Sequence, residues 1–223
     1  MRKHLQLFIK YIGLMIILGN LIGCVSTNQM SLAANPGDDG INHQLLLLKL
    51  VTGNQYHRDY QPVVEYVNIV NVDTNNVTHY GVDKVFRSSS QEQEYLLSFA
   101  LRPGNYMLRN ITGHSGVYPF VGTFDIPAYE RFSVGQTGVV YLGRLTAIVE
   151  KRSNDNQLRA GSIVPVIDQA VSGFSLGTFV ITVDNNYQDD MADFSAAYPV
   201  LMNDTAKVAI LPVWQQPTAS EMQ

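Results

Sequence analysis

The sequence has a single cysteine, few charged residues and no basic run. Its 223 residues are 15% charged and 46% hydrophobic, with a formal net charge of -4. One cysteine cannot form an intramolecular disulfide, which excludes a disulfide scaffold. The apolar fraction excludes a disordered chain, and the negative charge argues against nucleic acid as a partner. A globular protein of one or two domains is left.

The first 23 residues predict a secretory signal. Arg2, Lys3 and Lys10 belong to a basic head, and residues 11–22 are apolar apart from Asn20. An apolar run of about 7–15 residues behind such a head is typical of a signal peptide. A retained membrane-spanning helix is the less favoured alternative, because it needs about 20 apolar residues.

The cysteine stands where this apolar run ends. Leu21-Ile22-Gly23-Cys24 resembles the lipobox of bacterial lipoproteins. The resemblance implies cleavage before Cys24 and attachment of lipid to its sulfur and new amino group, which is more than stable membrane anchoring requires. The alternative is a free cysteine in an ordinary signal peptide. The residue after the cysteine is Val25. An aspartate at this position would resemble an inner-membrane retention signal of enteric bacteria. Because it is absent, we expect an outer membrane lipoprotein facing the periplasm or exterior. In a source with one membrane, the same chemistry implies the outer face of the cell.

The rest of the chain divides into three predicted parts. Residues 24–42 are expected to form the lipidated N-terminus and a flexible tether, because they show no sustained hydrophobic period. Such a tether spans on the order of 25 Å. Residues 43–213 are predicted to form the folded body, and residues 214–223 a C-terminal tail.

Short segments of alternating hydrophobicity run through this body. They predict a mainly β protein, a β-sandwich of about eight strands, with segments such as 45–51, 63–72, 95–101 and 179–183. One short helix is predicted near 187–197, with Asn186 as its N-cap. A calcium site at residues 184–193 is the less favoured interpretation, because an EF-hand loop needs a central glycine and a bidentate glutamate.

Arg102-Pro103-Gly104-Asn105 predicts a β-hairpin with a type II turn. With its flanks it resembles the "L-P-P-G-x-Y-x-L" hairpin of carboxypeptidase-regulatory-like, transthyretin-like β-sandwich modules. Segments 139–145 and 177–199 resemble parts of small bacterial lipoproteins built on such modules. The resemblance implies the fold and carries no catalytic residue; Arg102 departs from it, standing where the module often has proline.

The sequence offers little that points to catalysis or metal binding. Gly113-His114-Ser115-Gly116 resembles the "G-x-S-x-G" elbow of α/β hydrolases, but its second glycine comes one place early and no helix follows. We therefore interpret these residues as a loop between strands. The other histidines after the predicted signal are His43, His57 and His79, and they show no zinc-ligand spacing with His114. No catalytic residue, metal site or cofactor is predicted.

Tyr56, Arg58 and Tyr60 form the candidate partner-binding surface, because Tyr and Arg are enriched at interfaces. Packing of the tyrosines in a strand is the alternative, and the one we favour. The function expected is that of a lipid-anchored envelope protein acting as a non-catalytic binding or structural module, its partner an unidentified envelope protein. The alternative is an envelope hydrolase whose active site is assembled in space; it would show a pocket where titratable side chains with shifted pKa values converge.

Overall fold

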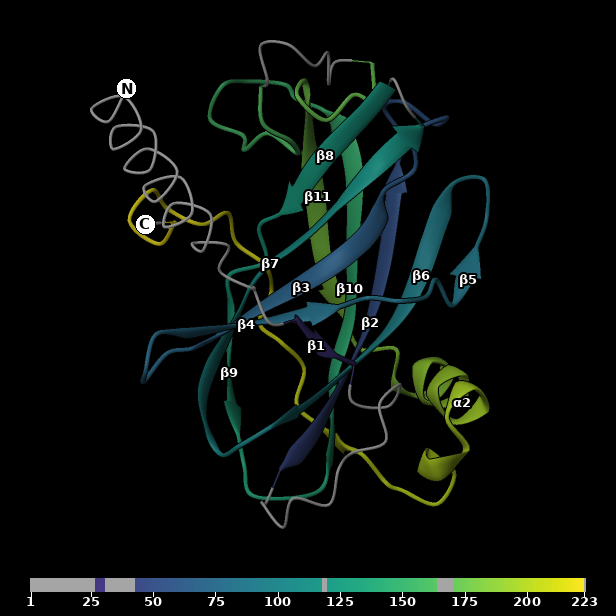
Figure 1. Ribbon diagram of the computed structural model, residues 1–223, viewed down its shortest axis with the longest axis vertical. Helices are drawn as coiled ribbons and strands as arrows, with labels where there is room; N and C mark the ends of the chain where they lie inside the picture. Colours follow the sequence, from purple (N-terminus) through teal and green to yellow (C-terminus); the bar gives the residue numbers. More distant parts are fainter. Residues whose placement is uncertain (1–26, 31–42, 118–119, 164–170, 223) are drawn as a thin grey trace, which may run out of the picture.

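The computed structural model describes residues 27–30, 43–117, 120–163 and 171–222. These residues form a β-sandwich with one α-helix near the C-terminus, which confirms the predicted fold class (Figure 1). The predicted signal peptide and Cys24 lie outside the described residues. Within them, no helix has the length and apolar character needed to cross a membrane.

The strands form two six-stranded mixed sheets, here called sheet A and sheet B (Figure 1). In spatial order, sheet A contains β1 (Thr27–Gln29), β4 (Asn76–Gly81), β3 (Val63–Asn71), β7 (Gly104–Val117) and β8 (Phe120–Ile126), with β9 (Glu130–Val134) also paired to β7. Sheet B contains β11 (Gly177–Asp184), β10 (Val139–Lys151), β2 (Gln44–Asn54), β6 (Glu92–Leu101) and β5 (Arg87–Ser88), with β12 (Lys207–Val208) also paired to β10. The very short strands β1, β5 and β12 account for most of the excess over the predicted number.

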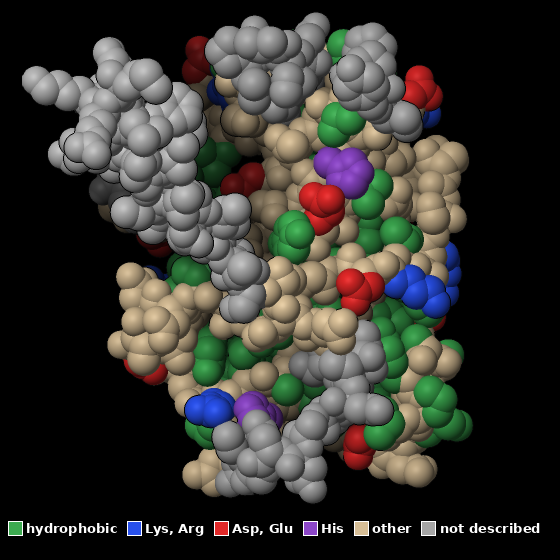
Figure 2. Space-filling model, in the orientation of Figure 1, with side chains coloured by type: hydrophobic (Ala, Val, Ile, Leu, Met, Phe, Trp, Pro, Cys, Tyr) green, Lys and Arg blue, Asp and Glu red, His purple; other side chains and the backbone are tan. Residues whose placement is uncertain are grey.

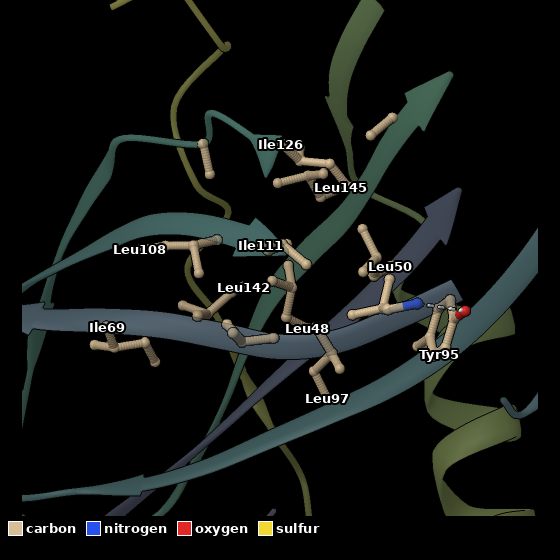
Figure 3. Close-up of a cluster of buried hydrophobic side chains, with 14 of the residues drawn as sticks. Leu48, Leu50, Ile69, Tyr95, Leu97, Leu108, Ile111, Ile126, Leu142 and Leu145 are labelled. Carbon is tan, nitrogen blue, oxygen red and sulfur yellow. Dashed lines mark hydrogen bonds between the residues drawn. The ribbon is translucent and has the colours of Figure 1, made fainter. Parts of the chain in front are cut away.

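The main hydrophobic core fills the space between the two sheets. Leu48 and Leu97 of sheet B point toward Ile69 and Ile111 of sheet A, and all four side chains are at most 1% exposed (Figure 3). Inward-facing residues recur at every second position, as the period-2 pattern predicts for strands with one face on a core.

Strand β2 is apolar on both faces because sheet B is covered on both. Leu48 and its neighbours of the same parity face sheet A, while Leu47 belongs to a second cluster under helix α2 (Tyr187–Ala197). The predicted helix is confirmed, and its Met191 and Phe194 are buried in that cluster. Its predicted cap is wrong: Asn186 makes no side-chain cap hydrogen bond, and the Asn185 side-chain oxygen accepts from the Tyr187 N–H at 3.2 Å instead.

The predicted hairpin at Arg102–Asn105 is also wrong. Strand β6 before the turn pairs with β2 and β5, whereas β7 after it pairs with β3, β8 and β9. The chain therefore crosses from sheet B to sheet A at Pro103. Turn residues reverse the chain locally, but they do not decide which strand accepts its hydrogen bonds.

Part of the expected tether belongs to the folded body. Thr27–Gln29 pairs in parallel with His79–Gly81 of β4, and Met30 is buried in the core. Backbone hydrogen bonding holds this segment, so it needs no hydrophobic period to become ordered. Only Val25 and Ser26 separate Cys24 from the first strand.

Candidate functional site

The three residues of the predicted surface lie on the loop that follows β2. Tyr56 is half-buried, packs against the core and meets the ring of His57 edge-on at 4.4 Å between centroids. Tyr60 is also half-buried, whereas Arg58 is exposed. The structure thus brings the three residues onto one loop, with Arg58 as the accessible member.

A single buried amide organises this loop. Asn54 is 1% exposed, and its Nδ2 donates to the carbonyl oxygens of Tyr60 at 2.9 Å and Ser172 at 3.0 Å. Its Oδ1 accepts from the His57 N–H at 2.8 Å. Its own N–H donates to Gln61 Oε1 at 3.0 Å. The loop from Asn54 to Gln61, here called the Asn54 loop, is therefore fixed at its base, and Asn54 is the residue that sequence reasoning missed.

Ser115 and His114 are not arranged as a nucleophile and a base. Both lie inside strand β7, so their interpretation as loop residues is wrong. Ser115 is 0% exposed, and its hydroxyl has no hydrogen-bond partner among the described residues. His114 is on the opposite face, where its Nδ1 lies 3.1 Å from Glu65 Oε1. Adjacent residues of a strand point to opposite faces, which separates the two side chains.

Titratable side chains do converge in one place, beneath helix α2. Lys49 Nζ lies 2.8 Å from Glu94 Oε2, 2.6 Å from Asp193 Oδ2 and 3.5 Å from Asp190 Oδ1. Asp190 also accepts hydrogen bonds from Arg144 and, at 2.5 Å, from the Tyr141 hydroxyl. On the outer side, Arg87 pairs with Glu94 at 2.7 Å and Asp193 at 3.1 Å.

This α2 ion cluster matches three carboxylates with three cations. Burial by itself would lower the pKa of Lys49, but its hydrogen bonds to Asp193 and Glu94 outweigh burial and raise it. Burial would likewise raise the pKa of Asp193, and its bonds to Lys49 and Arg87 lower it. Lys49 and Asp190 are 3% and 0% exposed, so substrate cannot reach them while α2 is in place. The cluster is suited to fastening the helix to sheet B.

Glu130 is a second titratable group that the sequence analysis overlooked. It stands at the start of β9 and is 6% exposed. Burial raises its pKa to about 7. Glu130 stands two and four residues before Phe132 and Val134, which face inward. In a strand this spacing places all three side chains on the same face, so the sequence pattern could have indicated that Glu130 is buried.

The hollows of the described surface include the two that follow. One, of about 330 Å³, lies between β8 and the segment after β10; it is lined by Thr123, Phe124, Asp125, Arg159, Gly161 and Ser162. The other, of about 450 Å³, lies at the start of α2 and includes Asn185 and Asp189. In the part of the chain that the structure describes, no three His, Cys, Asp or Glu side chains are grouped to hold a metal ion.

Comparison with family models, with curated proteins and with solved structures finds no match for this chain.

Proposed function

We propose that this protein is a lipid-anchored envelope protein that acts as a non-catalytic binding module. Cys24 carries the lipid, and the Asn54 loop is the surface that contacts a partner in the envelope. A transthyretin-like module, as the sequence resemblance implies, would suit this role because it provides a rigid scaffold for loops.

The observation that carries this proposal is the fixed base of the Asn54 loop. Binding residues often lie on loops that a rigid scaffold positions. A loop already held by the hydrogen bonds of Asn54 loses little conformational entropy on binding, so more of the contact energy appears as affinity. Arg58 is exposed beside the half-buried Tyr56 and Tyr60, which suits an anchor surrounded by aromatic surface.

The short link between Cys24 and β1 limits how far the body can move from the membrane. The three residue steps from Cys24 to Thr27 reach about 10 Å when the chain is extended. A flexible tether of 19 residues would span on the order of 25 Å. Because β1 is the edge strand of sheet A and pairs with β4, this edge of the sheet would stay near the lipid headgroups. The anchor therefore orients the module as well as retaining it.

The lipid anchor is tested with Cys24→Ser. We expect the native chain to fractionate with membranes and to carry acyl mass at its N-terminal peptide, and the variant to lose both. Membrane association of the variant, with no acyl mass on the native chain, would reject the anchor.

The binding surface is tested by cross-linking in living cells. Arg58→Ala removes the exposed side chain of the loop, and Arg102→Ala removes an exposed arginine of the turn between the sheets as a matched control. Loss of the cross-linked partner in the first variant alone supports the proposed surface. Equal recovery of the partner with both variants would show that the Asn54 loop is not the contact. Tyr56 is left intact because it packs against the core.

A further inference from the structure

A row of polar side chains crosses the outer face of sheet A, one from each of four strands. His79 Nδ1 of β4 lies 2.6 Å from Asn68 Oδ1 of β3. Asn68 Nδ2 donates to Asn110 Oδ1 of β7 at 3.0 Å, and Asn110 Nδ2 donates to Asp125 Oδ1 of β8 at 2.9 Å. Figure 2 shows this face, on which a few carboxylates and histidines stand apart within a surface made of backbone and of side chains that are neither apolar nor charged.

The bonds within the row leave a defined set of groups for a ligand. An asparagine amide has two N–H donors and an acceptor oxygen with two lone pairs. Asn68 and Asn110 each use one N–H and one lone pair within the row, so each keeps one donor and one acceptor. A hydroxyl group also donates and accepts, which makes a polyhydroxylated ligand complementary to this row.

The charges beside the row favour an uncharged ligand. Asp125 interacts favourably with the nearby Arg109, and Arg159 shares the adjoining hollow with it. Glu65 faces His114 on the same sheet. Neither sign is in clear excess, so the face suits neither an anionic headgroup nor a strongly cationic peptide.

Two further features fit a sugar. Tyr66 stands two residues before Asn68 on the same face, is 42% exposed, and lies opposite Gly81, which has no side chain. An exposed aromatic ring offers an apolar surface to the C–H face of a sugar ring, with its hydroxyl free for a hydrogen bond. At the Asp125 end, the hollow of about 330 Å³ is at the small end of the roughly 300–1,000 Å³ usual for ligand pockets.

We infer that the outer face of sheet A binds an uncharged, extended oligosaccharide that lies across strands β4, β3, β7 and β8. Neighbouring strands are about 4.8 Å apart, so the row repeats at that interval. A β-1,4-linked glycan chain is extended and advances by about one such interval per ring, which allows one ring for each strand. This site is separate from the Asn54 loop, and the two proposals can fail independently.

The test is calorimetric titration of the purified full chain in detergent with N-acetylglucosamine tetramer, which is β-1,4-linked. Maltotetraose, whose α-linked chain is curved, serves as the comparison ligand. We expect the tetramer to bind, Asn110→Ala to weaken its binding by about tenfold through loss of hydrogen bonds, and maltotetraose to bind more weakly. Asn203→Ala, at an exposed asparagine beyond helix α2 on the side of sheet B, is the matched control and should bind as the native chain does.

Hydrogen exchange locates the contact and checks the fold of each variant. Protection on binding should fall on β3, β4, β7 and β8, and free Asn110→Ala should keep the native exchange pattern. Absence of binding by the tetramer at millimolar concentration would overturn the inference. Equal weakening by Asn203→Ala, equal binding of maltotetraose, or protection on the Asn54 loop instead of sheet A would do the same.

Discussion

Glu130 gives the sharpest test of the electrostatics of this fold. Its carboxyl group is 6% exposed, and burial raises its pKa from 4.5 to about 7. The folded state therefore favours the protonated form more than the unfolded state does. The stability that this preference contributes is fully present below the unfolded pKa of 4.5, and it is lost as the pH rises through about 7.

The size of the effect follows from the difference between the two pKa values. Each pH unit between them corresponds to about 1.4 kcal/mol, so the native chain should lose about 3 kcal/mol of stability between pH 4.5 and pH 8.5 on this account. Glu130→Gln keeps the shape of the side chain and removes the titration. Other groups titrate equally in both proteins, so the difference between the two profiles isolates Glu130.

The assay is urea unfolding of both proteins at half-unit pH intervals. We expect the variant to gain about 3 kcal/mol on the native chain between the two ends of this range. Glu150→Gln, at an exposed glutamate of β10, should run parallel to the native chain throughout. Parallel profiles for Glu130→Gln and the native chain would refute the reasoning, because they would mean that Glu130 is solvated or paired in the folded protein.

Three further predictions concern stability and are checked by chemical denaturation. Lys49→Ala leaves Asp190 buried with one cation fewer and should lower the free energy of unfolding by about 3–5 kcal/mol. Arg87→Ala, at the exposed rim of the same cluster, should lower it by less. Equal losses of stability in the two variants would contradict a buried cluster. Ser115→Ala removes a buried hydroxyl that has no partner among the described residues and should leave stability unchanged or raise it by about 1 kcal/mol; a clear loss would show that the hydroxyl is bonded. Gly113→Ala places a Cβ 2.0 Å from the Val63 carbonyl oxygen and should prevent stable pairing of β3 with β7; a native-like melting temperature would contradict that pairing.

Local patterns predicted the fold class and the helix because each depends on residues close together in the chain. The alternation around Leu97 and Phe99 reflects which face of a strand meets the core. The spacing of Met191 and Phe194 reflects which side of the helix does. The grouping of Tyr56, Arg58 and Tyr60 on one loop likewise follows from their closeness in sequence.

Strand partners could not be predicted in this way. Pro103 and Gly104 indicate a turn, but the partners of β6 and β7 come from segments far along the chain, and both edges of β6 were already taken by β2 and β5. The interpretation of Ser115 as a loop residue was wrong for a related reason. Small residues within a 14-residue strand form the same local pattern as a turn.

The sequence by itself determined that this chain buries strand faces and one helix face, since hydrophobic periodicity is a property of neighbouring residues. Only the tertiary structure decided that Lys49 lies buried among three carboxylates and that Asn68, Asn110 and Asp125 form one row. These residues come from separate strands and a distant helix. Their chemistry exists only where backbone hydrogen bonding between remote segments places them side by side.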